Sequence, residues 1–201
     1  MAVADEAAAV LAATLPSYLK PDLTVVIARL APSPWSGELL EEPVFIDGEQ
    51  VRLLSRFYSP EPVDADIEDL TERQRQILAF LYGWHHDGHV RERWMTGLRG
   101  DESWLALVML RLIGDYIEPI WERALADIDA IPRARYVEFA RENPAFMSAT
   151  RDRIVSYHRY VGRFRRDFVE NPAYQFMVEL GLWQGHEARR WIAHATTVRA
   201  P

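Results

Sequence analysis

The densest group of side chains that could bind a metal or catalyse a reaction consists of histidines. Three of the six histidines lie within five residues, at His85, His86 and His89. Neutral imidazole is the commonest protein ligand for metal ions and also serves as a general acid or base, so this segment is a candidate metal site or catalytic centre. The intervening Asp87-Gly88 pair predicts a helix break, which would place His85 and His89 on different helices. The structural alternative puts the first two at a helix C-terminus, where positive charge is favoured.

Arginine forms the second concentration of reactive side chains, between residues 151 and 168. At helical spacing, Arg159, Arg163 and Arg166 fall together on the side opposite an apolar stripe. Such a row could bind phosphate, another anion or an acidic partner. The aromatic residues lie on the stripe and not beside the arginines, so the segment offers no platform for stacking bases. The alternative is an ordinary solvated helix face.

Composition narrows the classes of function. The chain has 201 residues, 49% of them hydrophobic and 26% charged, with a net charge of −7 and no cysteine. The absence of cysteine excludes disulfides, thiolate nucleophiles and Cys-ligated metals, and the acidic balance argues against a general nucleic-acid coat. The most apolar run, residues 104–113, is too short to span a membrane. We therefore expect a cytoplasmic protein with no nucleic-acid or membrane partner.

The first 69 residues predict a mixed front end that packs on the rest of the chain. An Ala-rich helix is expected over residues 7–15, and residues 23–30 fit either a strand or a short helix. Residues 43–54 predict a β-hairpin, because Asp47-Gly48 suits a two-residue turn with positive φ at both positions. With Ile46 paired to Glu49, one face of the hairpin becomes apolar. Residues 59–67 then read as an acidic, proline-containing linker.

From residue 70 to residue 201 the pattern predicts an α-helical body. Thr71 caps a helix over residues 71–82, Asp87 caps the next, and Asp101 opens a long apolar helix from Trp104. Pro119 either kinks that helix or starts another. Further helices are expected over residues 136–142, 144–168, 172–183 and 186–194. The predicted fold is mainly α, a compact array of antiparallel helix pairs with one N-terminal hairpin, in a single compact domain.

Part of the helical body resembles a known repeat family. Asp87, Val90, Arg91, Gly97 and Leu98 match the second helix of a HEAT repeat, and a poorer copy begins 28 residues later at Asp115. The resemblance covers residues 71–130 and departs from the family pattern at Trp94, which is too large for its position. It implies stacked helix pairs in which Asp87 and Arg91 belong to a structural polar ladder between repeats. An orthogonal helical bundle would give similar patterns, so both architectures stay open.

These observations favour a non-enzymatic helical protein-interaction module, such as a scaffold or adaptor, with a protein as its partner. Self-association is left open. The first alternative is a metal-dependent or acid–base enzyme centred on His85, His86 and His89. The second is anion or phosphate binding through the Arg159 row. No cofactor is expected apart from the metal that the first alternative would need.

Overall fold

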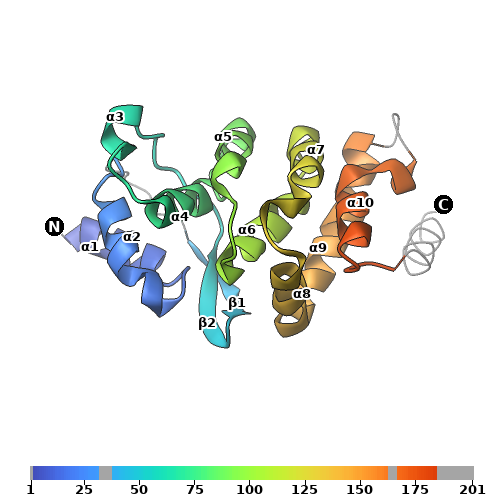
Figure 1. Ribbon diagram of the computed structural model, residues 1–201, viewed down its shortest axis with the longest axis horizontal. Coiled ribbons are helices and arrows are strands. Elements are labelled where there is room, and N and C mark those ends of the chain that lie inside the picture. The colour runs from blue at the N-terminus through green and yellow to red at the C-terminus, as the bar shows by residue number, and fades with distance from the viewer. Residues whose placement is uncertain (1, 32–37, 163–166, 185–201) are drawn as a thin grey trace.

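The helices of the protein broadly follow one another along its longest axis, whereas the hairpin lies further along that axis than α3 (Figure 1). The computed structural model describes residues 2–31, 38–162 and 167–184, with α1 near one end and α10 near the other (Figure 1). The architecture is mainly helical with a single two-stranded antiparallel sheet in the described residues, as the sequence predicts. Within those residues no helix has the length and apolar character needed to cross a membrane.

The N-terminal third supplies short helices and the hairpin. In chain order its elements are α1 (Ala2–Ala12), α2 (Lys20–Ile27), β1 (Leu39–Ile46), β2 (Glu49–Leu54) and α3 (Asp64–Ile67). Of the segment that fitted either a strand or a short helix, residues 23–27 are helical and residues 28–30 form a turn. Pro21 lies in the first turn of α2, where the missing N–H of proline costs no hydrogen bond.

The hairpin turn has the predicted geometry. Ile46 pairs with Glu49, and the two residues between them have positive φ, 52° at Asp47 and 79° at Gly48. A two-residue turn of this kind matches the right-handed twist of the strands. β1 begins earlier than predicted, at Leu39, with irregular pairing before Pro43.

One face of the hairpin belongs to the core. Val44, Ile46, Val51 and Leu53 are all buried, so the predicted apolar face is confirmed. Alternation with period two along each strand brings these side chains to the same side. The hairpin lies between the N-terminal helices and α8, at the lower centre of Figure 1.

Both outer edges of the hairpin make backbone hydrogen bonds to other parts of the chain. On the β2 side, the Arg52 N–H donates to the Ala13 carbonyl oxygen at 2.8 Å. On the β1 side, the Asn143 side chain accepts from the Phe45 N–H at 2.7 Å and donates to the Phe45 carbonyl oxygen at 2.8 Å. The amide of Asn143 thus pairs with Phe45 as a neighbouring strand would.

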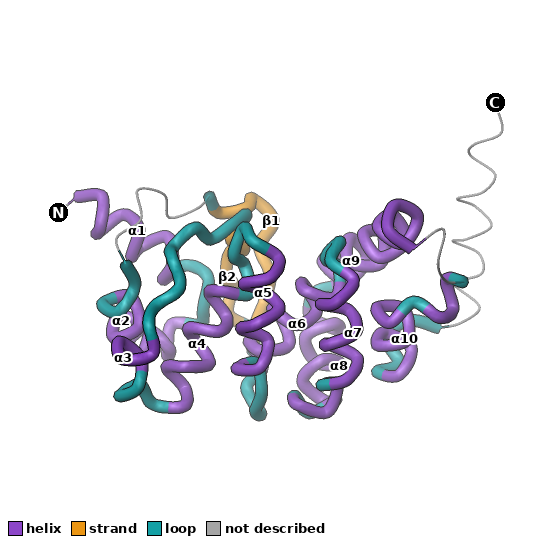
Figure 2. The backbone as a smooth tube through the Cα atoms, turned by 90° about the horizontal axis from the view of Figure 1, so that it is seen from above, coloured by secondary structure: helices purple, strands orange, loops and turns teal. Residues whose placement is uncertain are grey.

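The helical body forms two rows. Its helices are α4 (Glu72–Tyr82), α5 (Gly88–Trp94), α6 (Ser103–Ile113), α7 (Glu118–Ala126), α8 (Arg133–Glu142), α9 (Pro144–Tyr157) and α10 (Pro172–Glu179). One row contains α2, α4, α6 and α8, each beside the next, and the other contains α5, α7 and α10. Figure 2 shows the same succession from a perpendicular direction.

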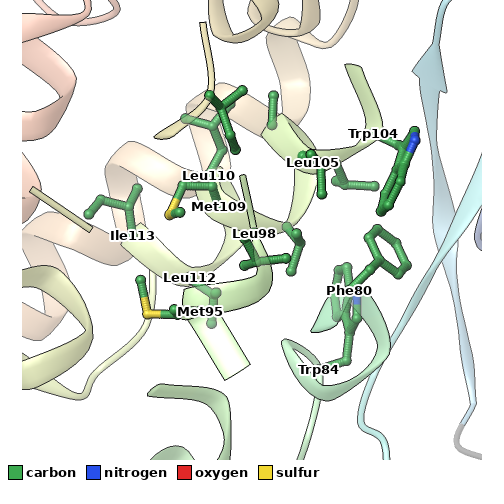
Figure 3. Close-up of a cluster of buried hydrophobic side chains, with 14 of the residues drawn as sticks. Phe80, Trp84, Met95, Leu98, Trp104, Leu105, Met109, Leu110, Leu112 and Ile113 are labelled. Atoms are coloured by element: carbon green, nitrogen blue, oxygen red, sulfur yellow. The ribbon is translucent and has the colours of Figure 1, made fainter. Parts of the chain in front are cut away.

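Helix α6 lies at the centre of the body. All of its residues are buried except Arg111. A helix that is apolar on every side must be covered on every side. Figure 3 shows its side chains among those of the neighbouring elements, including Phe80, Trp84 and Leu98. The buried hydrophobic residues form one cluster that runs from the N-terminal helices to α10.

Several predicted boundaries move in the structure. The start of α6 is Ser103, and Asp101 lies outside it, paired with Arg135 at 2.7 Å. Pro119 starts α7 and does not kink α6. The helix predicted to continue to residue 168 ends at Tyr157 and is followed by a π-helical turn, His158–Gly162. The helix predicted over residues 186–194 lies outside the described residues.

Close packing of α4 on α6 gives a first prediction. A Cβ atom added at Gly83 would lie 2.4 Å from Cγ2 of Val108 on α6, so Gly83→Ala should destabilise the protein by about 2 kcal/mol through overpacking. Gly48→Ala is the comparison, since it meets open space and carries only the left-handed backbone cost of about 1 kcal/mol. Urea unfolding measures both, and a Gly83→Ala protein as stable as the wild type would contradict the packing.

Candidate functional site

The three clustered histidines lie at the turn between α4 and α5, in three different environments. His85 is buried, and its Nδ1 accepts a hydrogen bond from the Asp87 N–H at 3.1 Å. His86 is exposed and stacks on Tyr58 with ring centroids 5.0 Å apart. The His89 side chain is 78% exposed in the first turn of α5. Among the described residues, no three His, Asp or Glu side chains form a group that could hold a metal ion.

Burial sets the electrostatics of this turn. It lowers the pKa of His85, with a further decrease from the neighbouring His86, so the neutral imidazole is favoured. Asp87 caps α5, because its Oδ1 accepts from the His89 N–H at 2.8 Å. That backbone hydrogen bond is the main cause of the lowered pKa of the Asp87 carboxyl. The Asp87 side chain therefore contacts its own helix and does not pair with Arg91.

Arg91 connects two turns of the fold. Its side chain is 1% exposed and donates through Nη1 to the His85 carbonyl oxygen at 2.6 Å and to that of His86 at 3.1 Å. Its Nη2 donates to Oδ1 of Asp115 at 2.9 Å. Arg91 thus joins the end of α4 to the turn between α6 and α7. Whether Asp87 and Arg91 belong to a repeat ladder stays a prediction.

Among the described residues, Asp115 is the only Asp or Glu whose side chain is buried. Its Oδ1 also accepts from the Tyr116 N–H at 2.7 Å, and its carbonyl oxygen accepts from Nε1 of Trp121 at 2.8 Å. Its Oδ2 has no hydrogen-bond partner within the described part of the chain and faces Nη1 of Arg111 at 3.6 Å. One carboxylate therefore fixes Arg91 and the start of α7 and attracts a second arginine.

Further arginines gather around this ion pair. We call Arg56, Arg91, Arg111 and Arg153 the arginine cluster. The Arg111 guanidinium lies 5.5 Å from the centroid of the Trp84 ring, a cation–π distance. Nε of Arg153 lies 3.0 Å from the place that a Cβ on Gly114 would take. The cluster draws its members from the segment after β2 and from α5, α6 and α9.

Burial lowers the pKa of two members of the cluster, and neighbouring arginines lower that of Arg111 further. Burial lowers the pKa of Arg111 to about 10, the charge of Arg153 lowers it next, and Asp115 opposes both effects. Arg56 and Arg91 lower it further. Burial also lowers the pKa of Arg153. The other three guanidinium groups of the cluster are thus close enough to Arg111 to disfavour its charge.

The arginine row proposed from the sequence is described only in part. Arg159 is exposed in the π-helical turn, and Arg163 and Arg166 lie outside the described residues. The sequence reading did not identify the arginine cluster as a site. Arg111 did carry a local signal, since it is the single charge in the apolar run of residues 104–113. Arg56 and Arg153 carried none, because they are distant in sequence.

A separate hollow of about 580 Å³ lies at the start of α4 and has the opposite charge. Four acidic residues and one arginine contribute to its lining: Asp22, Glu72, Asp101, Glu102 and Arg73. Glu102 accepts a hydrogen bond from the Tyr18 hydroxyl at 3.3 Å and pairs with Arg73 at 3.3 Å. Burial, followed by the charge of Glu102, raises the pKa of Tyr18 to about 12. Glu102, at least, thus pairs with neighbouring side chains at this surface.

Comparison of the chain with protein-family models, with curated proteins and with solved structures gives no match.

The buried ion pair gives a second prediction. Arg91→Met leaves Asp115 buried without its closest partner, so the free energy of unfolding should fall by about 3–5 kcal/mol. Arg135→Met is the matched control, because Arg135 pairs with the exposed Asp101 and such pairs contribute about 1 kcal/mol or less. Urea unfolding monitored by circular dichroism measures both variants. Equal losses would show that burial does not set the importance of the Arg91 pair.

The lowered pKa of His85 gives a third prediction. Because the folded protein holds the proton on His85 less readily than the unfolded chain, the stability from neutral His85 is complete above the unfolded pKa of 6.5 and is lost as the pH falls below it. In His85→Gln, the free energy of unfolding should therefore fall less steeply between pH 7 and pH 5. His158 contributes in the same direction and stays in place. His89→Gln is the exposed control, and a slope unchanged by His85→Gln would refute the assignment.

Proposed function

We propose that this chain is a non-enzymatic protein-interaction module, a scaffold or adaptor built from HEAT-like helix pairs. The observation that carries the proposal is the arrangement of the helices in two rows. Arg91 of the pair α4–α5 is hydrogen-bonded to Asp115, which follows α6 in the next pair, α6–α7. Stacked pairs of this kind cover one another's apolar stripes and leave extended surfaces on which a partner can bind. The resemblance over residues 71–130 supports the same reading.

One surface has the composition of a binding surface. We call Arg111, Arg153, Tyr116 and Tyr157 the Arg–Tyr surface. Tyr116 is 42% exposed, and its ring meets that of Tyr157 edge to face at 5.9 Å. Tyrosine and arginine are enriched among the residues that contribute most to protein–protein binding.

Contacts with buried residues also fix the position of Tyr116 in the Arg–Tyr surface. The guanidinium of Arg91 lies 5.9 Å from the centroid of the Tyr116 ring, and the Tyr116 N–H is bonded to the buried Asp115. A partner that binds Tyr116 would order little additional structure, so less of the binding energy would be lost to conformational entropy. This rigidity favours the surface over the exposed Tyr160, which is 82% exposed.

The fourth prediction tests this interaction. A photo-crosslinking amino acid replaces Tyr116 in the full-length chain, and in a control it replaces Tyr160. Irradiation in cells should attach one protein reproducibly at position 116 and not at position 160. The complex rebuilt from the purified components should bind at least about tenfold more weakly with Tyr116→Ala than with Tyr160→Ala. Equal crosslinking at both positions, or none at position 116, would refute the proposal.

A further inference from the structure

The arginine cluster contains more positive charge than its fold neutralises. Arg91 and Arg111 lie against one buried carboxylate, that of Asp115, and the charges of Arg56 and Arg153 also act on Arg111. Oδ1 of that carboxylate is already shared by Arg91 and the Tyr116 N–H. The remaining oxygen of Asp115 faces Arg111 at 3.6 Å, beyond hydrogen-bond distance. Tyr157, Asp115, Asp152 and Glu42 all favour the charge of Arg153, but Asp152 and Glu42 are exposed. Among the described residues, Asp115 is therefore the one buried carboxylate that acts on Arg111 and Arg153.

Burial makes this excess costly. The Arg111 side chain is only 13% exposed, so water solvates its charge poorly. Like charges held together in a low-dielectric environment destabilise one another unless an ion of opposite charge joins them. The lowered pKa of Arg111, caused first by burial and next by the charge of Arg153, is the expected result of this destabilisation. An anion bound beside Arg111 and Arg153 would offset this repulsion between their charges.

The donors of the cluster are also ordered in advance. Arg111 lies against the Trp84 ring, and Arg153 is fixed by its hydrogen bond from Nη2 to the Thr150 hydroxyl at 2.9 Å. Nε of Arg153 and Nε1 of Trp84 are buried and have no hydrogen-bond partner among the described residues. Guanidinium groups fixed in this way match the oxygen atoms of carboxylates and phosphates with little loss of side-chain entropy.

We infer that Arg56, Arg111 and Arg153 form a binding site for an oxyanion, and that acidic side chains of the protein partner supply it. The second part rests on the proposed function, because the site adjoins Tyr116 on the Arg–Tyr surface. The first part concerns the isolated chain alone. This site differs from that of the Arg159 row, of which Arg159 is exposed in the turn after α9 and the other two arginines lie outside the described residues.

The fifth prediction tests the site with two probes, inorganic phosphate and a tetraglutamate peptide. Each is titrated into the full chain by calorimetry, with chloride keeping the ionic strength constant, because surface screening alone would otherwise change the signal. Saturable phosphate binding is expected, with a rise in Tm of about 3 °C at about ten times Kd. The peptide should compete with phosphate if a partner's carboxylates are the natural anion, and a failure to compete would refute that part.

Variants separate the site from general charge effects. Arg153→Gln and Arg56→Gln should each weaken phosphate binding at least about tenfold, whereas Arg159→Gln should leave it unchanged. Both test residues are half-buried, so unfolding without phosphate checks that the variants stay folded. No saturable binding, equal binding in Arg153→Gln, or a loss confined to Arg159→Gln would overturn the inference. The titration contains no partner protein, so a negative result would refute the anion site alone. A negative crosslinking result would refute the proposed interaction surface.

Discussion

The carboxylate of Asp115 is the charge on which the centre of this protein depends. It lies where the turn after α6 meets the turn after α4, and it provides the negative charge that lets Arg91 be buried. Arg91 in turn satisfies two carbonyl oxygens at the end of α4. A buried arginine without such a partner would be strongly unfavourable. The same carboxylate attracts Arg111, so the ion pair that joins the helix pairs also organises the proposed binding surface.

Features that depend on neighbouring residues could be predicted from the sequence. Asp47-Gly48 specified the hairpin turn, and the alternation around it specified which face is buried. Thr71 caps α4 in a capping box with Gln74, and Asp87 caps α5. In each case, the physical cause lies within a few residues along the chain. Prediction was less accurate at helix ends such as Tyr157, where His158 contacts Asn171 and the chain turns back toward α10.

Features that depend on distant segments could not be predicted in this way. The charges of Arg56 and Arg153 act on Arg111 although the three residues belong to the segment after β2, to α9 and to α6, and no local spacing encodes that proximity. The three histidines illustrate the opposite case, in which residues close in sequence lie in different environments. Their closeness in sequence suggested a shared site, but the break at Asp87-Gly88 directs His85 into the core and leaves His89 in solvent. The spacing of charged residues along one predicted helix therefore does not show which residues of other segments contact them.

The pairing of Asn143 with Phe45 has a consequence for how copies of this protein meet. An open strand edge offers unpaired N–H and C=O groups on which another chain can add a strand and begin a fibril. Here the amide of Asn143 occupies that position on β1, and the Ala13 carbonyl oxygen occupies one on β2. Each edge of the small two-stranded sheet is thus partly occupied from within the chain, which leaves fewer backbone groups for another chain to pair with.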